Sequence, residues 1–167
     1  MAAFRNGPPL GDVMFKSACI AAAVFLFALT PVIAATPTGA PTKDEVIERV
    51  TKAVEFYRAN GRERTIAELN RHDGAFAKGM DYVDLHDING VCVAHPKSPD
   101  LVGQNRLNVA DIRGKHFIKE IIDAAKTHPD GWITFMKENP NNGRIEHKIA
   151  YWEVHDGLIF KAGTYEQ

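Results

Sequence analysis

The sequence has few of the residues on which covalent catalysis and disulfide bonding depend. It contains two cysteines, and Cys92 is the only one after residue 35. Ser98 is likewise the only serine in that part of the chain. A Gly-rich phosphate loop, a nucleophile elbow and a paired-cysteine metal motif are all absent from the sequence. The sequence therefore predicts no internal disulfide after residue 35, no enzymatic activity and no cofactor.

The sequence also has no marked excess of positive or negative charge. The formal net charge of the 167 residues is −1, so bulk electrostatics favours neither nucleic acid nor an anionic membrane as a partner. Apolar residues make up 45% of the chain and charged residues 25%, as in soluble globular proteins. The length is enough for one ordinary domain.

The N-terminal segment has the pattern of a secretory signal. An uncharged apolar run, Ser17–Leu29, follows Lys16 and precedes the small residues Ala34 and Ala35. The run is shorter than the about 20 residues that span a bilayer. We therefore expect a cleaved signal peptide at residues 1–35, with Met14 as an alternative start, and no stable membrane insertion after cleavage. An uncleaved N-terminal anchor is the alternative. Export of a chain without disulfides favours the periplasm.

Helical periodicity begins after a flexible lead-in at residues 36–41. Thr42 and Glu45 have the spacing of a capping box, and the helix that they start is expected to end near Ala59, before Gly61. A similar pattern at Thr65–Glu68 predicts a second, shorter helix. A third is predicted after Gly114 by apolar residues at helical spacing, namely Phe117, Ile118, Ile121, Ile122 and Ala125.

Strand patterns fill most of the remaining chain. They cover residues 82–86, 91–95, 132–137, 145–154 and 158–165. Asn89-Gly90 predicts a tight turn between the first two strands, and Pro96 ends the second because proline has no N–H for the ladder. Short loops favour antiparallel neighbours. We therefore expect an α+β fold with one five-stranded antiparallel sheet and helices packed on it.

His95 stands where a strand ends and a loop begins, a position that suits a pocket. As a hydrogen-bond donor it would hold a small anion, and Lys148 offers a second positive charge. Tyr82 and Tyr151 offer hydroxyl groups, and Trp132 an apolar wall. Lys148 and Tyr151 are three residues apart, however, so they share a face only across a bulge. The alternative is that Lys148 is an exposed strand lysine and Trp132 a core residue.

Two other uses of the histidines stay open. His86 and His95 lie on the two arms of the hairpin, where they would bind zinc or copper with Asp84 or His147 as a third ligand. The spacing matches no established metal motif, so no metal is predicted. Asp84 and His86 share one strand face and would suit acid–base chemistry, although no nucleophile accompanies them.

Taken together, several segments of the chain resemble the single Cache domain, a PAS-like extracellular sensor module of bacteria. The segments that carry the resemblance are residues 81–96, 101–105, 111–126, 131–135, 139–154 and 162–165. The resemblance implies a long N-terminal helix, a PAS-like antiparallel sheet and a small-ligand pocket. Matched by position, the pocket residues would be His95, Trp132, Lys148 and Tyr151, with Tyr82 a weaker candidate.

The resemblance implies a binding function for residues 42–167 as one ligand-binding domain. Its ligand would be a short organic acid of the acetate, propionate, pyruvate or lactate class. Because this chain ends at the last strand, we expect a free-standing module without an output domain, whose partner would be a membrane-bound sensor kinase or chemoreceptor. The alternative is a ligand-free interaction module that docks on a membrane sensor or envelope complex.

Overall fold

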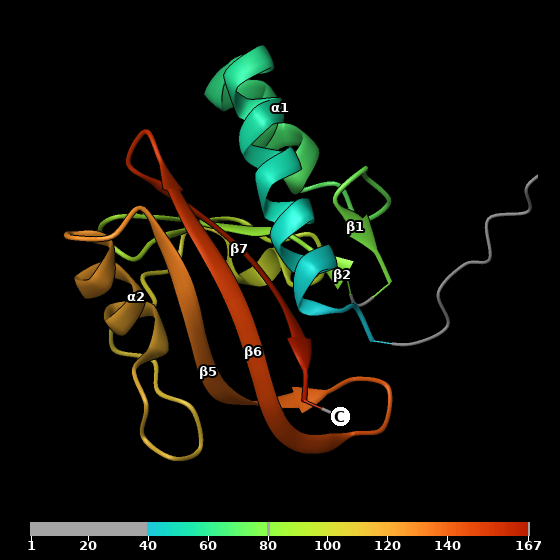
Figure 1. Ribbon diagram of the computed structural model, residues 1–167, viewed down its shortest axis with the longest axis vertical. Coiled ribbons are helices and arrows are strands. Elements are labelled where there is room, and N and C mark those ends of the chain that lie inside the picture. Colours follow the sequence, from blue (N-terminus) through green and yellow to red (C-terminus); the bar gives the residue numbers. More distant parts are fainter. Residues whose placement is uncertain (1–39, 80, 167) are drawn as a thin grey trace, which may run out of the picture. The chain divides into compact units, whose positions relative to one another are not determined.

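The structure is a computed structural model, in which residues 40–79 and 81–166 are described (Figure 1). The predicted signal peptide at residues 1–35 and most of the lead-in lie outside the described residues. Among the residues that are described, no helix is both long and apolar enough to cross a membrane.

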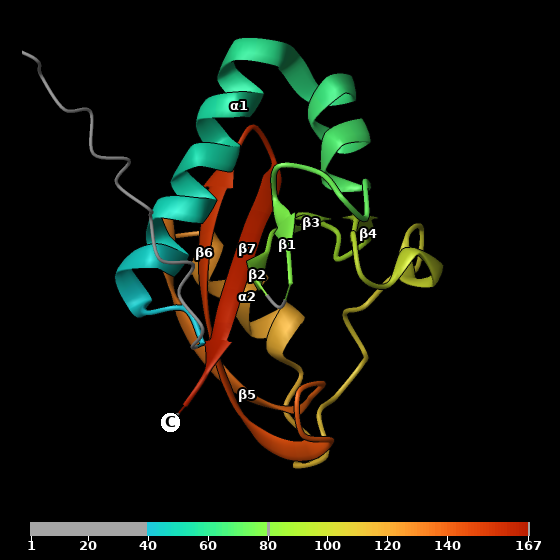
Figure 2. The ribbon, with the colours of Figure 1, turned by 90° about the vertical axis from the view of Figure 1, so that its right-hand side faces the viewer.

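The first helix, α1, runs from Lys43 to Leu69 and begins with the predicted capping box. The Thr42 hydroxyl accepts a hydrogen bond from the Glu45 N–H, and the Glu45 carboxylate accepts one from the Thr42 N–H at 2.7 Å. Gly61 interrupts the helix with a φ of +77°, a conformation that suits glycine, and α1 changes direction there (Figure 2).

The predicted second capping box is wrong. The segment after Gly61 is already helical before Thr65, which is buried inside it. The Thr65 hydroxyl donates to the carbonyl of Gly61 at 2.8 Å instead of accepting from a free N–H. A threonine can bond back to the carbonyl four residues earlier as readily as it can cap a helix, so the motif alone misplaced the helix start.

The predicted five-stranded antiparallel sheet is confirmed, with strands in the order β4-β3-β7-β6-β5. Its strands are β3 (Asp84–Asp87), β4 (Cys92–Ala94), β5 (Asp130–Asn139), β6 (Arg144–His155) and β7 (Leu158–Tyr165). A separate two-stranded ladder joins β1 (Ala77–Lys78) to β2 (Asp81–Tyr82). The last helix, α2, covers Phe117–Ala125, and a short 3-10 helix, η1, covers Pro99–Leu101.

The hairpin between β3 and β4 turns where the sequence predicts. Gly90 has a φ of +82°, and the Asp87 carboxylate accepts hydrogen bonds from the N–H groups of Asn89 and Val91. The register shifts between Leu85 and His86, which marks a bulge in this hairpin. β4 ends at Ala94, so His95 begins the loop that leaves the sheet.

The two faces of the sheet carry separate cores. α1 lies over one face, and its apolar side chains pack on those of the strands, including Leu85, Leu158 and Phe160. α2 lies against the other face and buries Ile118, Ile121 and Ile122 there. Figure 1 shows the two helices on either side of β5, β6 and β7. This is the α+β, PAS-like arrangement that the sequence predicts.

Candidate ligand-binding site

Three charged side chains project from the sheet toward the α2 face. Lys148 on β6 follows the same alternation as Ala150 and Trp152, which belong to the α2-side core. Asp84 on β3 and Lys161 on β7 are direct cross-strand partners, so their side chains share a face. The sheet register thus gathers charges from three neighbouring strands on one side.

A cavity of about 50 Å³, called the inner cavity below, lies at this cluster. One of its walls is polar and consists of Tyr82, Asp84, His86, His95, Lys148 and Lys161. Its apolar lining, called the apolar wall below, consists of Leu101, Phe117, Ile118 and Phe135, of which Phe135 is the cross-strand neighbour of Lys148. Arg106 and Lys137 complete the lining. A few convergent polar groups facing an apolar wall are typical of small-molecule sites.

Lys148 is the most unusual group of the inner cavity. Its side chain is buried, with 6% of the residue exposed, and its Nζ donates to the Tyr82 hydroxyl at 3.4 Å. The same Nζ lies 4.8 Å from the ring centre of Tyr82 and 5.4 Å from that of Tyr165. Among the described residues no carboxylate forms an ion pair with it.

The pKa of Lys148 is lowered, as expected for a buried ammonium without a counter-ion. Burial, with repulsion from Lys161, lowers its pKa to about 7, and attraction from Asp84 offsets only part of this. The neighbouring hydroxyl behaves in the opposite sense, because burial, Asp84 and Tyr165 raise the pKa of Tyr82 above its usual range. Tyr82 therefore stays a protonated phenol that can donate a hydrogen bond.

Gly163 makes room for the Lys148 side chain on the neighbouring strand. A Cβ at this position would lie 3.0 Å from Cε of Lys148 and 2.7 Å from the carbonyl oxygen of Ile149. Both distances are too short for a side chain to fit without movement. The glycine of β7 is thus part of what positions the ammonium.

His95 faces the inner cavity as a neutral imidazole. Its Nδ1 accepts hydrogen bonds from the backbone N–H groups of Lys97 at 3.3 Å and Ser98 at 3.0 Å. The proton is therefore on Nε2, which is left as a donor. Burial lowers the pKa of His95 to about 4, although Asp84 acts in the opposite direction. His95 is thus a neutral group whose Nε2–H can donate a hydrogen bond into the cavity.

Asp84 and Lys161 form a buried ion pair beside these groups. The Lys161 Nζ lies 2.6 Å from Asp84 Oδ2, and His86 Nδ1 lies 3.2 Å from Asp84 Oδ1. Burial would raise the pKa of Asp84, but Lys161 and His86 together lower it below its usual range. Lys161 is therefore neutralised within the protein, and Lys148 is not.

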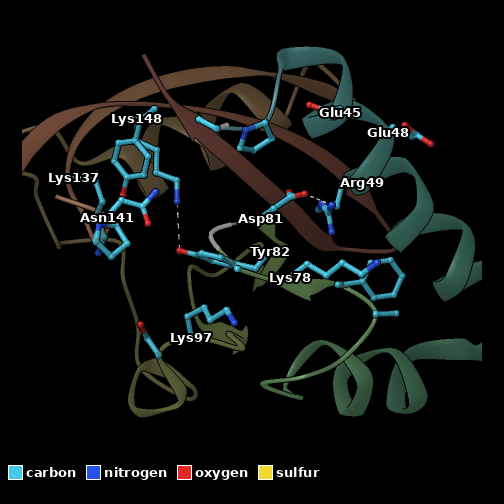
Figure 3. A pocket seen from close by; sticks show the side chains of 18 of the residues that line it. Glu45, Glu48, Arg49, Lys78, Asp81, Tyr82, Lys97, Lys137, Asn141 and Lys148 are labelled. Carbon is cyan, nitrogen blue, oxygen red and sulfur yellow. Dashed lines mark hydrogen bonds and ion pairs between the residues drawn. The ribbon is translucent and has the colours of Figure 1, made fainter. Parts of the chain in front are cut away.

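An outer groove of about 1160 Å³ adjoins the inner cavity and opens to solvent. It runs between the first turns of α1, the β1–β2 hairpin and the loop from β5 to β6 (Figure 3). Tyr82, Lys137 and Lys148 line both spaces. Figure 3 shows Lys148 and Tyr82 pointing toward one another at this boundary. The groove gives a path from solvent to the inner cavity.

Three of the five predicted site residues meet at the inner cavity, namely Tyr82, His95 and Lys148. Trp132 and Tyr151 do not reach it. They are cross-strand partners on the α1 face, with ring centres 5.3 Å apart. Tyr151 is part of the α1-side core, and Trp132 is 39% exposed beneath the ammonium of Lys43. β6 pairs with both neighbours without a register shift, so no bulge turns Tyr151 toward Lys148.

The described residues do not form the zinc or copper site that the sequence left as an alternative. His147 is on the opposite strand face from Lys148 and pairs with Glu166 at 2.9 Å. Nδ1 of His95 is already occupied by two backbone N–H groups. In residues 40–79 and 81–166 no group of three or more histidine, cysteine or carboxylate side chains is placed to hold a metal ion.

Sequence reasoning missed four polar residues of the cavity as ligand-site residues. Asp84 and His86 were considered only for metal binding or acid–base chemistry, and Lys161 and Arg106 not at all. For Lys161 a signal existed, because a lysine between Phe160 and Ala162 in an otherwise apolar strand is unusual. Arg106 lies in an irregular loop, where no periodicity shows which way a side chain points.

The family model for single Cache domain 2 matches residues 29–157, and the chain belongs to this family. Its fold is similar to three solved structures. The first is a Cache chemosensory domain studied for carboxylic acid recognition, with a TM-score of 0.63 and 18% identity over 74% of this chain and 92% of that one.

The second similar structure is a methyl-accepting chemotaxis protein from Vibrio parahaemolyticus, with a TM-score of 0.59 and 21% identity. The match covers 74% of this chain and 84% of that one. The third is the periplasmic sensor domain of a chemotaxis protein, with a TM-score of 0.55 and 19% identity over 74% and 90% of the two chains. At these identities the likeness establishes the fold.

Proposed function

We propose that this protein is a periplasmic sensory module that binds a short organic acid in the inner cavity. The ligand carboxylate would contact the Lys148 ammonium, with the Tyr82 hydroxyl and Nε2 of His95 as further donors. The alkyl part would face Leu101, Phe117 and the rest of the apolar wall. The structural similarity to a domain studied for carboxylic acid recognition supports this assignment.

The observation that carries the proposal is the buried ammonium of Lys148 without a carboxylate partner. A buried charge is normally paired, because removing it from water is costly. Asp84, the carboxylate that lines the same cavity, is already paired with Lys161. An anion that enters the cavity would supply the missing charge and form a charge-assisted hydrogen bond, worth about 1.5–3 kcal/mol.

The size of the inner cavity restricts the ligand. At about 50 Å³ it has room for roughly three to five water molecules, given about 10–15 Å³ for each. An acid of two or three carbons fits that space. Longer acids would extend past Lys148 into the outer groove.

Isothermal titration calorimetry of the purified protein with acetate, propionate, pyruvate, lactate and butyrate tests the proposal. We expect binding of at least one two- or three-carbon acid, weakened at least tenfold by His95→Ala and by Lys148→Ala. Tyr151→Phe is the matched control, since Tyr151 lies on the other face, and should bind as the wild type does. Absence of heat and of thermal stabilisation with every acid would reject the proposal and favour the ligand-free interaction module.

The proposed role in the cell rests on the same structural similarity. Two of the similar structures come from chemotaxis proteins, one of them a periplasmic sensor domain. We infer that ligand occupancy of this domain is read by a membrane-bound receptor or sensor kinase. Co-purification from cells with and without the bound acid would test this, and a partner that binds equally in both states would contradict it.

A further inference from the structure

Two buried polar atoms of the inner cavity have no hydrogen bond within the described residues. They are Oδ1 of Asp84 and Nδ1 of His86. The atoms lie 3.2 Å apart, but not in the orientation that a hydrogen bond needs. Asp84 is 3% exposed and His86 6%. Because nearly all buried polar side-chain atoms are paired in folded proteins, these two indicate a missing partner.

The missing partner has to be a hydrogen-bond donor. Oδ2 of Asp84 accepts from Lys161 at 2.6 Å, so the second oxygen is the one left over. The ionised carboxylate has no proton to give, because Lys161 and His86 outweigh burial and lower its pKa below the usual range. Asp84 lines the same cavity as Lys148. The cavity thus offers cationic and neutral donors to a carboxylate and, separately, an acceptor to something else.

We propose that the ligand is a hydroxy acid of two or three carbons, whose carboxylate contacts Lys148 and whose hydroxyl donates to Oδ1 of Asp84. This assignment rests on the proposed function and narrows it. A hydroxyl is favoured over an ammonium because Lys161 already neutralises Asp84, so a further cation beside it would find no free negative charge. Glycolate and lactate fit the volume of about 50 Å³ as acids of two and three carbons.

Matched pairs of ligands test the assignment on the wild-type protein. Glycolate differs from acetate, and lactate from propionate, only by the hydroxyl group. A site that holds a substrate hydroxyl discriminates against the analogue without it, because its own buried group is then left unpaired. We expect each hydroxy acid to bind roughly ten times more tightly than its partner or better.

The results separate this inference from the proposed function. Equal affinities within each pair would overturn the hydroxy acid and leave the carboxylate site intact. No binding by any of the four acids would reject the proposed function. Tighter binding of glycine or alanine than of glycolate or lactate would overturn the choice of a hydroxyl over an ammonium.

A double variant tests whether Asp84 is the residue that favours a hydroxy acid over the analogue without the hydroxyl. Asp84→Leu combined with Lys161→Met removes the acceptor and its counter-ion together, so that no unpaired charge is left behind. In this variant the lactate-to-propionate affinity ratio should fall close to one. Tyr151→Phe, a change on the other face of the sheet, should keep the wild-type ratio. If the lactate-to-propionate affinity ratio is the same without Asp84 as in the wild type, the proposal is overturned.

Discussion

The two faces of the sheet are built on different principles. The α1 face is covered by apolar side chains from α1, β3 and β7, and Leu85, Leu158 and Phe160 are fully buried there. The α2 face buries a comparable apolar cluster but also takes in Asp84, Lys148 and Lys161. The first face stabilises the fold, whereas the second carries the buried charges of the proposed binding site.

The alternation of side chains along each strand explains how one sheet carries an apolar core on one face and a charged cluster on the other. Side chains alternate between faces, so neighbouring residues such as Lys148 and Ile149, or Phe160 and Lys161, belong to different environments. A substitution on the α1 face is therefore expected to change stability. One at the charged residues of the α2 face is expected to change binding, unless it breaks the ion pair.

The largest effect is expected from truncating the α1-side core. Phe160→Ala removes a ring with 0% exposure and should lower the free energy of unfolding by about 3–5 kcal/mol. Ile145→Ala on β6, at an exposed position, should change it by less than about 0.5 kcal/mol. Urea denaturation measures both. Equal effects of the two substitutions would contradict the assignment of Phe160 to a stabilising core.

The next effect concerns the buried ion pair on the α2 face. Asp84→Asn leaves Lys161 buried without a counter-ion and should lower the free energy of unfolding by about 3 kcal/mol. Asp84→Leu with Lys161→Met removes both charges and should recover most of that loss. If the single variant is as stable as the wild type in the same denaturation experiment, the pair does not neutralise Lys161.

A smaller effect, and on binding instead of stability, is expected at Lys148. Lys148→Met should weaken acid binding by about 1.5–3 kcal/mol, because it removes the charged donor to the carboxylate. The unfolding free energy without ligand should stay the same or rise, since an unpaired buried charge is removed. Calorimetry and urea denaturation measure the two. A destabilised variant that binds normally would reverse the roles given to the two faces.

The smallest expected effect is the pH dependence of the binding free energy, which is about 1.4 kcal/mol per pH unit at most. Burial holds the pKa of Lys148 near 7 without ligand. An anion favours the charged form, so affinity should be constant just below pH 7 and fall as the pH rises above it. Lys148→Arg should remove this dependence. A wild-type affinity that is flat from pH 6 to 9 would contradict the account.

Stability without ligand should show the opposite trend. Between pH 7 and the ordinary pKa of lysine, 10.5, the unfolded chain holds a proton on Lys148 that the folded protein has released. The contribution of Lys148 to the unfolding free energy therefore rises with pH in this range. Lys148→Met should lose that rise, which pH-dependent denaturation would show.

The fold could be predicted from the sequence because its signals are local. The capping box at Thr42, the turn at Gly90 and the apolar face of α2 each depend on residues a few positions apart. The error at Thr65 has the same origin, since the motif for a helix start also occurs inside a helix. The family resemblance added the arrangement that short-range patterns leave open.

The site could be predicted only in part because it depends on register. Tyr82, His95 and Lys148 come together through the pairing of β6 with β7 and β7 with β3, which no single segment encodes. The alternation along β6 did separate Lys148 from Tyr151, and the structure agrees with it. Trp132 was predicted as an apolar wall of the pocket, but it lies on the α1 face with its cross-strand partner Tyr151. The role of Lys161 depends on Asp84, which is distant in the sequence.

The most direct test of the central claim is a titration of Lys148 by NMR, with the Nζ or Cε signal followed with and without lactate. Without the acid we expect a pKa near 7, and with saturating acid a clear rise, because the ligand supplies the counter-ion that the protein lacks. A pKa near the ordinary lysine value in the free protein, or one that the acid does not move, would contradict the claim that Lys148 is held ready for an anion.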